Sequence, residues 1–343
     1  MAFPGLSEIT TTTLRNRTGV LADNFTRNNA LIARLNRKGK VKPFNGGRTI
    51  VQELAYANNQ TFQYYSGYQL LNIAPSQTFT AAEYPIRQAA VAVTISGLEE
   101  IQNSGPNAII DLLESRIENA EGTFLNGLSL GMYGDGSLTG SINGLQNLVS
   151  TSPSSGTVGG IDRGTYPFWR NFAYRAVTDG GAALSSANIQ HYMNTVWTNV
   201  VRGRDMPDLI VADNQAYVKY LESLQAIQRI TTDNSAPDLA EAGFMSLKYM
   251  TADVVMDGGY QGTTSDPFSP TYAGGTAVGG APTNTMWFLN TNYIHWRPYE
   301  ERNMVPLDPK RFSVNQDAMV RLLGFAGNMT LSAAFLQGVL NNS

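Results

Sequence analysis

The residues with the most evident catalytic potential are Gly127–Gly131 (GLSLG), which match the GxSxG pattern of a serine nucleophile. In enzymes that use this pattern, the serine sits on a sharp turn between a strand and a helix. Here the motif closes a long amphipathic segment that predicts a helix. A base would have to come from His191 or His295, and neither has a supporting signal. A serine hydrolase using Ser129 is therefore only the third-ranked interpretation.

Other chemistry is even less well supported. The chain has no cysteine, so disulfides, thiolate metal sites and cysteine nucleophiles are excluded, and its two histidines lack metal-binding spacing. Gly134–Gly136 (GDG) lacks the third glycine and the preceding strand of a dinucleotide fingerprint. The carboxylate pairs Glu99-Glu100 and Glu300-Glu301 are typical of solvated charges. We expect no enzyme activity, no metal and no cofactor.

Charge is low and unevenly distributed. Charged residues make up 15% of the 343, and residues 1–48 hold nine Lys/Arg against two Asp/Glu, which leaves 15 against 25 elsewhere. A basic segment on an acidic body is suited to reach another surface, either a neighbouring subunit or a polyanion. No stretch approaches the roughly 18 apolar residues of a membrane span, and the composition of Met1–Thr10 leads us to expect no secretory signal there. A surface rich in small polar groups suits a protein covered by its own copies.

The first part of the sequence predicts projecting elements. Residues 1–47 predict an extended arm, with a short helix possible over Val20–Arg37. Residues 48–87 predict a long hairpin rich in aromatic side chains. An isolated hairpin is marginally stable in water, so this one needs a partner surface, either its own domain or a neighbour.

The rest alternates helices and strands. Residues 88–98 alternate apolar and polar side chains as a half-buried strand does, and residues 105–130 predict a helix with an acidic face. A Gly/Ser/Thr-rich stretch, 131–165, precedes an α+β domain over 166–305. Its expected helices are 185–202, capped by Ser185 or Ser186, and 214–229. Its expected strands are 208–212, 253–256 and 285–290. Residues 319–336 are expected to return and pair with the strand at 91–95.

Two stretches resemble a known family. Gly159–Asn171 reads GGIDRGTYPFWRN, and Leu98–Gly136 reads LEEIQNSGPNAIIDLLESRIENAEGTFLNGLSLGMYGDG. Both are similar to segments of the major capsid proteins of tailed bacteriophages, which have the Hong Kong 97-type fold, and the order of elements is similar throughout. The resemblance implies an α+β capsid fold divided into an N-terminal arm (1–47), an E-loop (48–87), a P domain with its spine helix (88–135), an A domain (136–304) and a C-terminal return to the P domain (305–343).

The same resemblance implies a structural role. Such a protein assembles as pentamers and hexamers into an icosahedral shell around double-stranded DNA, contacts the DNA non-specifically, and is found in the virion after assembly in the host cytoplasm. Its further partners would be a portal, a separate scaffolding protein and a decoration protein, with no membrane. Residues 48–87 contain no lysine, so the isopeptide cross-link of some members is not expected. An encapsulin-like protein compartment is the alternative.

Inter-subunit contacts are expected from the arm's cations, the hairpin's aromatic rings and the acidic face of the long helix. We expect the arm's charge to meet a neighbouring subunit rather than DNA. The candidate residues are Arg15, Arg17, Arg27, Arg34, Tyr56, Phe62, Tyr64, Tyr65, Tyr68, Asp111, Glu114, Glu118 and Glu121.

Overall fold

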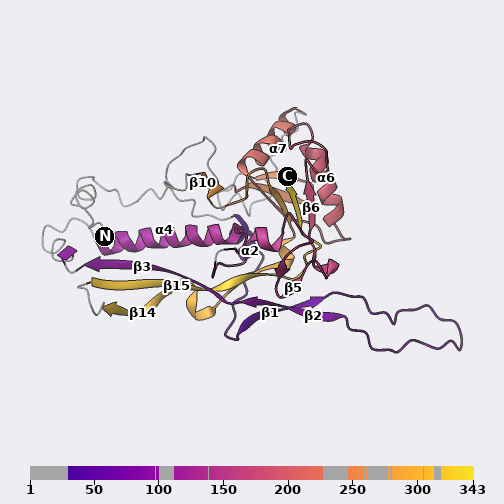
Figure 1. The fold of residues 1–343 in the computed structure, drawn as a ribbon, viewed down its shortest axis with the longest axis horizontal. Helices are drawn as coiled ribbons and strands as arrows, with labels where there is room; N and C mark the ends of the chain where they lie inside the picture. Colours follow the sequence, from indigo (N-terminus) through magenta and orange to yellow (C-terminus); the bar gives the residue numbers. More distant parts are fainter. Residues whose placement is uncertain are drawn as a thin grey trace.

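The structure is a computed structural model, and it describes residues 30–343 apart from 97, 100–111, 138, 227–245, 258–259, 262–276, 279, 304 and 313–317. The molecule is L-shaped (Figure 1). A long helix and a sheet run side by side along one limb, a compact α/β layer forms the other, and a narrow hairpin projects from the corner.

The first limb is built on an antiparallel sheet. Its longest strand, β15, pairs with β3 along one edge and with β13 and β14 along the other. The strands are β3 (Arg87–Ser96), β13 (Ile294–Pro298), β14 (Val305–Phe312) and β15 (Ala318–Leu331). Val93 is buried while Ala92 and Thr94 are exposed, as the alternating pattern predicted. The expected return of the last strands is confirmed, with Val91 opposite Leu323.

The long helix α4 (Leu112–Tyr133) lies along β3. It continues past the predicted end at residue 130, because Phe124, Leu128 and Met132 recur every four residues and are all buried. The predicted start at residue 105 lies outside the described residues. The GxSxG motif falls within this helix, so Ser129 is not on the strand-to-helix turn that a hydrolase requires.

Glu99 corrects one expectation. We expected a solvated charge, but Glu99 is buried and its carboxylate binds the Arg116 guanidinium of α4 at 2.7 Å. The Arg116 guanidinium also donates to the Thr94 carbonyl at 2.7 Å. The hydrogen bonds from Arg116 hold the pKa of Glu99 below its usual value, against the effect of burial. This ion pair joins the long helix to the end of β3.

The second limb contains a six-stranded mixed sheet in the order β6-β16-β12-β7-β9-β8. The strands are β6 (Phe172–Arg175), β7 (Leu209–Ala212), β8 (Ser246–Tyr249), β9 (Ala252–Met256), β12 (Met286–Leu289) and β16 (Gly338–Asn341). β7 and β9 are parallel. β7 (LIVA) is a continuous apolar run, as expected for a strand covered on both faces, whereas β9 (ADVVM) carries the buried Asp253. The strands predicted at 208–212, 253–256 and 285–290 are thus confirmed.

Helices α6 (Ile189–Val200) and α7 (Asn214–Ala226) cover one face of this sheet, packing on Ile210, Val254 and Phe288. The predicted cap was wrong. Asn188 occupies the N-cap position of α6, and its side-chain oxygen accepts a hydrogen bond from the Ser185 backbone at 2.8 Å instead of capping the helix.

The opposite face of the sheet meets α2 (Ala30–Arg37) and the end of α4. The helix expected over Val20–Arg37 is present for residues 30–37, and the rest lies outside the described part. After α2, residues 40–44 run alongside β13. Isolated parallel β-bridges join the two segments, including one between Val41 and Trp296. The remaining short elements are α5 (Leu145–Leu148), β4 (Thr157–Val158), β5 (Ile161–Asp162), β10 (Tyr260–Gln261), β11 (Ala277–Val278) and three 3-10 turns at Pro167–Trp169, Thr291–Tyr293 and Glu300–Arg302.

Candidate subunit-contact surface

The projecting hairpin is formed by β1 (Thr49–Ala55) and β2 (Phe79–Pro85). The two strands are antiparallel, from Thr49 opposite Pro85 to Ala55 opposite Phe79. Beyond them the chain runs out and back without forming further strand (Figure 1). The predicted hairpin at 48–87 is therefore present, with ordered pairing only at its root.

The root of the hairpin is anchored in the core. Ile50, Leu54, Ala82 and Tyr84 are all buried. The Tyr84 hydroxyl donates to the Leu331 carbonyl and accepts from the Leu331 amide, both at 3.2 Å. Burial raises the pKa of Tyr84 above its usual value, so the phenol stays neutral and can donate. The hairpin is thereby fixed to the end of β15.

A second anchor comes from Gly159–Asn171, which we call the brace segment. Its Gly159 carbonyl accepts a hydrogen bond from the Glu83 amide at 2.9 Å, beside the hairpin root. Gly159 has φ +59°, and a Cβ there would lie 2.8 Å from the Cβ of Ala82. Glycine is therefore required by close approach as well as by backbone conformation. The contact of Gly159 with the hairpin root therefore explains why glycine begins the GGIDRGTYPFWRN stretch.

The brace segment is itself held by buried and partly buried hydrogen bonds. Arg163 is almost fully buried and donates to the Leu148 carbonyl, and burial lowers its pKa to about 10. The Trp169 indole donates to the Val158 carbonyl at 2.9 Å, and the Arg170 guanidinium donates to the Arg163 carbonyl at 2.6 Å. The Asn171 side chain donates to the Ser150 carbonyl at 2.8 Å. These contacts make the segment a rigid support.

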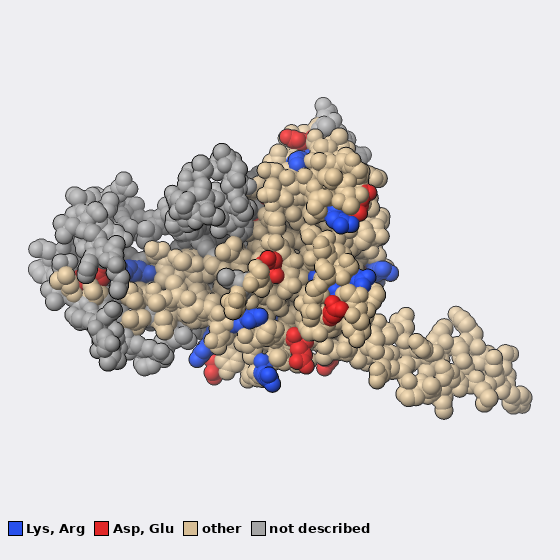
Figure 2. Space-filling view, viewed as in Figure 1, with Lys and Arg blue, Asp and Glu red and all other residues tan. Residues whose placement is uncertain are grey.

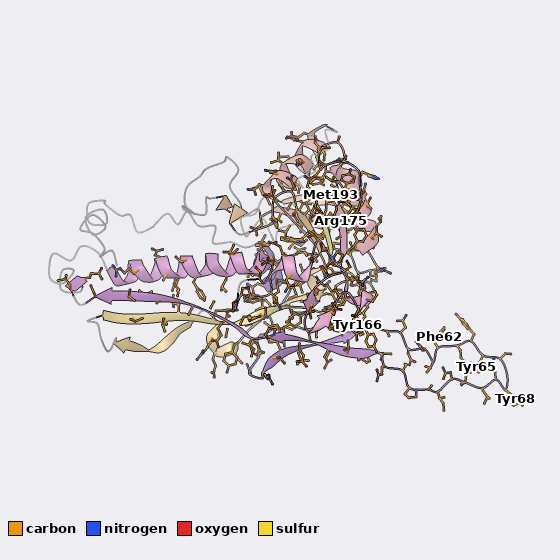
Figure 3. The ribbon with its side chains drawn as sticks, in the orientation of Figure 1. Phe62, Tyr65, Tyr68, Tyr166, Arg175 and Met193 are labelled. Carbon is orange, nitrogen blue, oxygen red and sulfur yellow. The ribbon has the colours of Figure 1, made fainter. Side chains whose placement is uncertain are left out.

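Aromatic rings connect the brace segment to the hairpin. The Phe168 ring lies 5.2 Å from that of Tyr56 and 5.9 Å from that of Tyr166, measured between centroids. Tyr166 is half exposed and lies where the hairpin leaves the body (Figure 3). The aromatic surface of the body therefore continues directly onto the hairpin.

The outer part of the hairpin has no charge. Residues 54–82, which we call the uncharged loop, contain no Lys, Arg, Asp, Glu or His in 29 positions. In the space-filling view, the projecting tip carries no charged side chain, whereas the body does (Figure 2). The side chains of this loop therefore cannot form ion pairs with the surface that the loop binds.

The uncharged loop exposes large apolar side chains to solvent. Tyr68 is fully exposed, and Phe62 is 76% exposed, with its ring centroid 5.4 Å from that of Tyr64 (Figure 3). The exposed large apolar side chains of the loop are Phe62, Tyr64, Tyr65, Tyr68, Leu70, Leu71, Ile73 and Phe79. A continuous apolar surface of this kind marks an interaction site in a soluble protein.

A few side-chain hydrogen bonds hold the two sides of the loop together. The Ser76 hydroxyl and the Thr61 hydroxyl both donate to the Asn59 side-chain oxygen, at 3.1 and 2.8 Å. The Gln63 amide donates to the Leu70 carbonyl at 3.1 Å. These bonds keep the loop narrow and extended, and they leave its rings available to another molecule.

The residues predicted as inter-subunit contacts fall into three groups. Phe62, Tyr64, Tyr65 and Tyr68 come together on the loop, and Tyr56 is half-buried at its root. Glu121 is exposed on α4. Arg15, Arg17, Arg27 and Asp111 lie outside the described residues, as do the side chains of Glu114 and Glu118.

Arg34 lies elsewhere. Its side chain is 12% exposed and binds two carboxylates of its own chain, Asp208 at 3.2 Å and Asp253 at 3.4 Å. Lys38 adds a contact to Asp208 at 2.7 Å, and Lys248 one to Asp253 at 2.9 Å. This part of the expected arm is therefore an integral part of the body, and its contact with a neighbour remains an untested prediction.

The sequence analysis missed two parts of the candidate contact surface: further exposed side chains of the loop, and the segment that supports the hairpin. Ile73 and Phe79 are exposed on the loop beside the predicted rings, and their signal was the absence of charge over residues 54–82. The brace segment's support of the hairpin was also missed. The adjacent glycines Gly159 and Gly160, both at positive φ in the structure, were its only local signal.

The described residues show no alternative chemical centre. Among them, no group of three or more His, Asp or Glu side chains could hold a metal, and no helix is long and apolar enough to cross a bilayer. His295 is buried in β13, where burial first and then the nearby Lys42 and Lys40 lower its pKa to about 4. His191 is exposed on α6, and no contact between it and Ser129 is seen among the described residues.

Comparisons with known proteins give the fold. No family model matches the sequence, and no curated protein sequence matches it. Among solved structures, the capsid asymmetric unit of cyanophage A-1(L) aligns with TM-score 0.68 and 17% identity, over 97% of this chain and 98% of that chain. A chain of Mycobacterium phage Ogopogo aligns with TM-score 0.52 and 12% identity, over 97% and 98%.

A chain of the SrpI encapsulin complex from Synechococcus elongatus also aligns, with TM-score 0.52 and 9% identity over 100% of this chain and 96% of that chain. These similarities cover nearly the whole length of each protein and include the limb, the α/β layer and the hairpin. The predicted α+β fold is confirmed: the chain has the Hong Kong 97-type fold of phage capsid proteins.

Proposed function

We propose that this chain is the major capsid protein of a tailed bacteriophage, a structural subunit that assembles into an icosahedral shell around double-stranded DNA. The observation that carries the proposal is the uncharged loop. A rigidly braced hairpin holds large apolar side chains away from its own body, and these are stabilised only when another surface covers them. The fold shared with phage capsids supports a second copy of the same chain as that surface.

The subunits would form pentamers and hexamers, as the resemblance to phage capsid proteins implies, through head-to-tail contacts that close into rings. Each loop contact is modest, and many contacts in a closed shell act together. A separate scaffolding protein, a portal and a decoration protein are proposed as further partners. The protein would belong to the virion and assemble in the host cytoplasm, and it would have no enzymatic role.

The test is to substitute loop side chains and image the particles. Tyr68→Ser and Ile73→Ser each remove a fully exposed apolar group, so unfolding of the free subunit should be unchanged. Each should raise the subunit concentration needed for assembly by about one to two orders of magnitude, because a buried side chain of this size contributes about 1.5–3 kcal/mol. Negative-stain microscopy with the phage's helper proteins present measures the yield of shells.

Tyr68→Phe is the matched control, since it keeps the ring and loses only the hydroxyl, and shells should form as in the wild type. Normal assembly of both serine variants would show that the loop does not join subunits. Wild-type protein that remains a monomer with its helper proteins present would overturn the shell function itself.

An encapsulin-like compartment is the second candidate, because the SrpI encapsulin chain aligns along the whole of this chain. The contents of purified particles separate the two. Double-stranded DNA that resists nuclease supports a phage capsid, and a protein cargo without nucleic acid supports a compartment.

A further inference from the structure

Three asparagines of the chain are followed directly by glycine. These pairs are Asn45-Gly46, Asn126-Gly127 and Asn143-Gly144. In such a pair the backbone nitrogen of glycine can attack the side-chain carbonyl carbon of asparagine, because glycine has no Cβ to hinder the approach. The attack requires a backbone that is free to rotate and a nitrogen that is not held elsewhere. Since the three pairs contain the same two residues, their surroundings in the fold decide which of them reacts.

Asn126-Gly127 lies inside helix α4, which runs from Leu112 to Tyr133. In an α-helix each backbone amide donates to the carbonyl four residues earlier, so the Gly127 nitrogen is held in the hydrogen-bond ladder of the helix. Attack on the Asn126 side chain would require this part of α4 to unfold first. The helix therefore protects the second pair.

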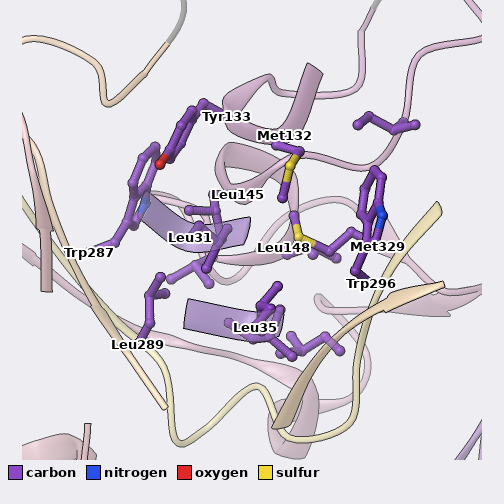
Figure 4. Packing of buried hydrophobic residues seen from close by; sticks show 14 of the residues in the cluster. Leu31, Leu35, Met132, Tyr133, Leu145, Leu148, Trp287, Leu289, Trp296 and Met329 are labelled. Carbon is purple, nitrogen blue, oxygen red and sulfur yellow. The ribbon is translucent and has the colours of Figure 1, made fainter. Parts of the chain in front are cut away.

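Asn143-Gly144 is held by packing and by hydrogen bonds. A Cβ at Gly144 would overlap the backbone of Gly134, so the two segments are in direct contact. The Asn143 amide donates to the Asn328 side-chain oxygen at 2.8 Å. Leu145 and Leu148, which follow the pair, lie fully buried inside the core (Figure 4). The third pair therefore cannot rotate without opening the core.

Asn45-Gly46 lies at the surface, in the link between the segment beside β13 and the start of β1. Asn45, Gly46 and Gly47 are all exposed, and a Cβ at Gly46 would meet nothing within 4 Å. Gly46 has φ +131° and Gly47 has φ +107°, conformations that glycine adopts without strain. Within the described part of the chain, the Gly46 amide donates no hydrogen bond. This nitrogen is therefore available for the attack.

The link that contains this pair is fixed at both ends. The Phe44 amide donates to the Pro298 carbonyl at 3.1 Å, and the Phe44 ring lies 5.4 Å from that of Tyr299, measured between centroids. At the other end, Thr49 begins the paired strand at the hairpin root. Residues 45–48 thus join two fixed points, and a change in their backbone acts on the attachment of the hairpin.

We propose that Asn45 is a site of spontaneous deamidation and isoaspartate formation, while Asn126 and Asn143 stay intact in the folded chain. The Gly46 nitrogen loses its proton and forms a bond to Asn45 Cγ. The bond from Cγ to Nδ2 then breaks, and ammonia leaves, so that a cyclic imide remains. Water opens the imide at one of its two carbonyls. Opening at Cγ gives aspartate, and opening at the main-chain carbonyl gives isoaspartate.

The modification changes the link in two ways. Either product places a carboxylate in the exposed stretch between Lys42 and Arg48. Isoaspartate also routes the main chain through Cβ and Cγ, which adds one backbone atom between the two fixed points. Because the reaction needs only water, the modified form accumulates with the age of the subunit.

Peptide mapping of the full-length free subunit, aged in mildly alkaline buffer, tests the proposal against unaged protein. Trypsin releases residues 41–48 as one peptide, because it does not cleave between Lys42 and Pro43, and residues 117–163 as another that holds both protected pairs. Peptide 41–48 should gain one mass unit at least about tenfold faster than peptide 117–163, since reaction at the protected pairs must wait for local unfolding. Labelling with isoaspartyl methyltransferase should mark peptide 41–48.

The same chain aged in denaturant is the matched control, because all three pairs should then react at similar rates. Asn45→Gln keeps the amide but would need a larger ring, so its peptide 41–48 should keep its mass in the aged folded protein. The proposal is overturned if peptide 117–163 of the folded protein reacts as fast as peptide 41–48. It is also overturned if peptide 41–48 reacts only in denaturant, or if Asn45→Gln gains mass at the wild-type rate.

Discussion

Single residues of the brace segment determine how the hairpin is held. Gly159 and Gly160 are adjacent and both adopt positive φ, at +59° and +76°. They differ in their surroundings, because a Cβ at Gly159 would meet Ala82 and the Tyr84 ring, whereas a Cβ at Gly160 would meet nothing within 4 Å. Alanine substitutions at Gly159 and Gly160 therefore distinguish two effects on the free energy of unfolding: the backbone strain of a positive φ, and the steric overlap of an added methyl group.

Gly159→Ala should lower the free energy of unfolding by about 2–4 kcal/mol, the sum of left-handed strain and overpacking. Gly160→Ala should lower it by only about 1 kcal/mol, from strain alone. Denaturant unfolding of the free subunit measures both. Equal effects in the two variants would show that the hairpin root can shift to accept a methyl group at Gly159.

At the scale of elements, α2 shows how a short helix is made stable by distant charges. Arg34 contacts Asp208, which directly precedes β7, and Asp253 on β9, and both lie more than 170 residues away along the chain. The two carboxylates are mostly buried, so the ion cluster stabilises the docked helix only while its cations stay in place.

Arg34→Ala should lower the free energy of unfolding by about 2 kcal/mol, less than for an isolated buried pair, because Lys38 and Lys248 still reach the two carboxylates. Arg204→Ala, at an exposed position of the second limb, is the control and should change it by less than about 0.5 kcal/mol. Thermal unfolding measures both variants. A loss in Arg34→Ala no larger than the control's would mean that the cluster contributes no net stability.

At the scale of the whole molecule, the uncharged loop gathers large exposed apolar side chains in a segment that has no charged residue. The body carries the charged side chains, and the uncharged loop projects beyond it (Figure 2). Contacts made by such a loop are apolar, and salt does not screen them. Assembly driven by the loop should therefore differ in its salt response from assembly driven by the basic arm.

Shell yield should stay constant or rise as NaCl increases from about 0.1 M to about 1 M, with the helper proteins present. Light scattering follows the yield, and microscopy identifies the product as closed shells. A fall of tenfold or more would show that charged contacts dominate. The cations in residues 1–29 would then be the first candidates, as the charge distribution of the sequence suggested.

Local patterns predicted the fold well wherever one face of an element is buried. The alternation around Val93 and the apolar run at 209–212 specified strands, because burial on one or both faces leaves a period in the sequence. The prediction of the α6 cap was wrong because Ser185, Ser186 and Asn188 are all residue types that favour the N-cap position. In the structure the helix begins after Asn188.

The candidate surface was predicted in part. The exposed rings of the loop were identified from their number in a short hairpin. The partners of Arg34 could not be identified from the sequence, because no local pattern connects Arg34 with Asp208. In a basic segment, a cation that is buried in an ion pair has the same sequence context as one that faces solvent. For the same reason, the support of the hairpin by Gly159 depends on a contact with Ala82 that only the folded chain brings together.

The position of β16 has a consequence for the timing of folding. This strand lies inside the six-stranded sheet, parallel to β6 and antiparallel to β12, although it is made last of the three. While the ribosome is still translating, β6 and β12 have no strand between them, and the central layer stays open. A nascent or truncated subunit that stops before residue 338 therefore lacks a closed core, and only chains translated through β16 can complete this layer.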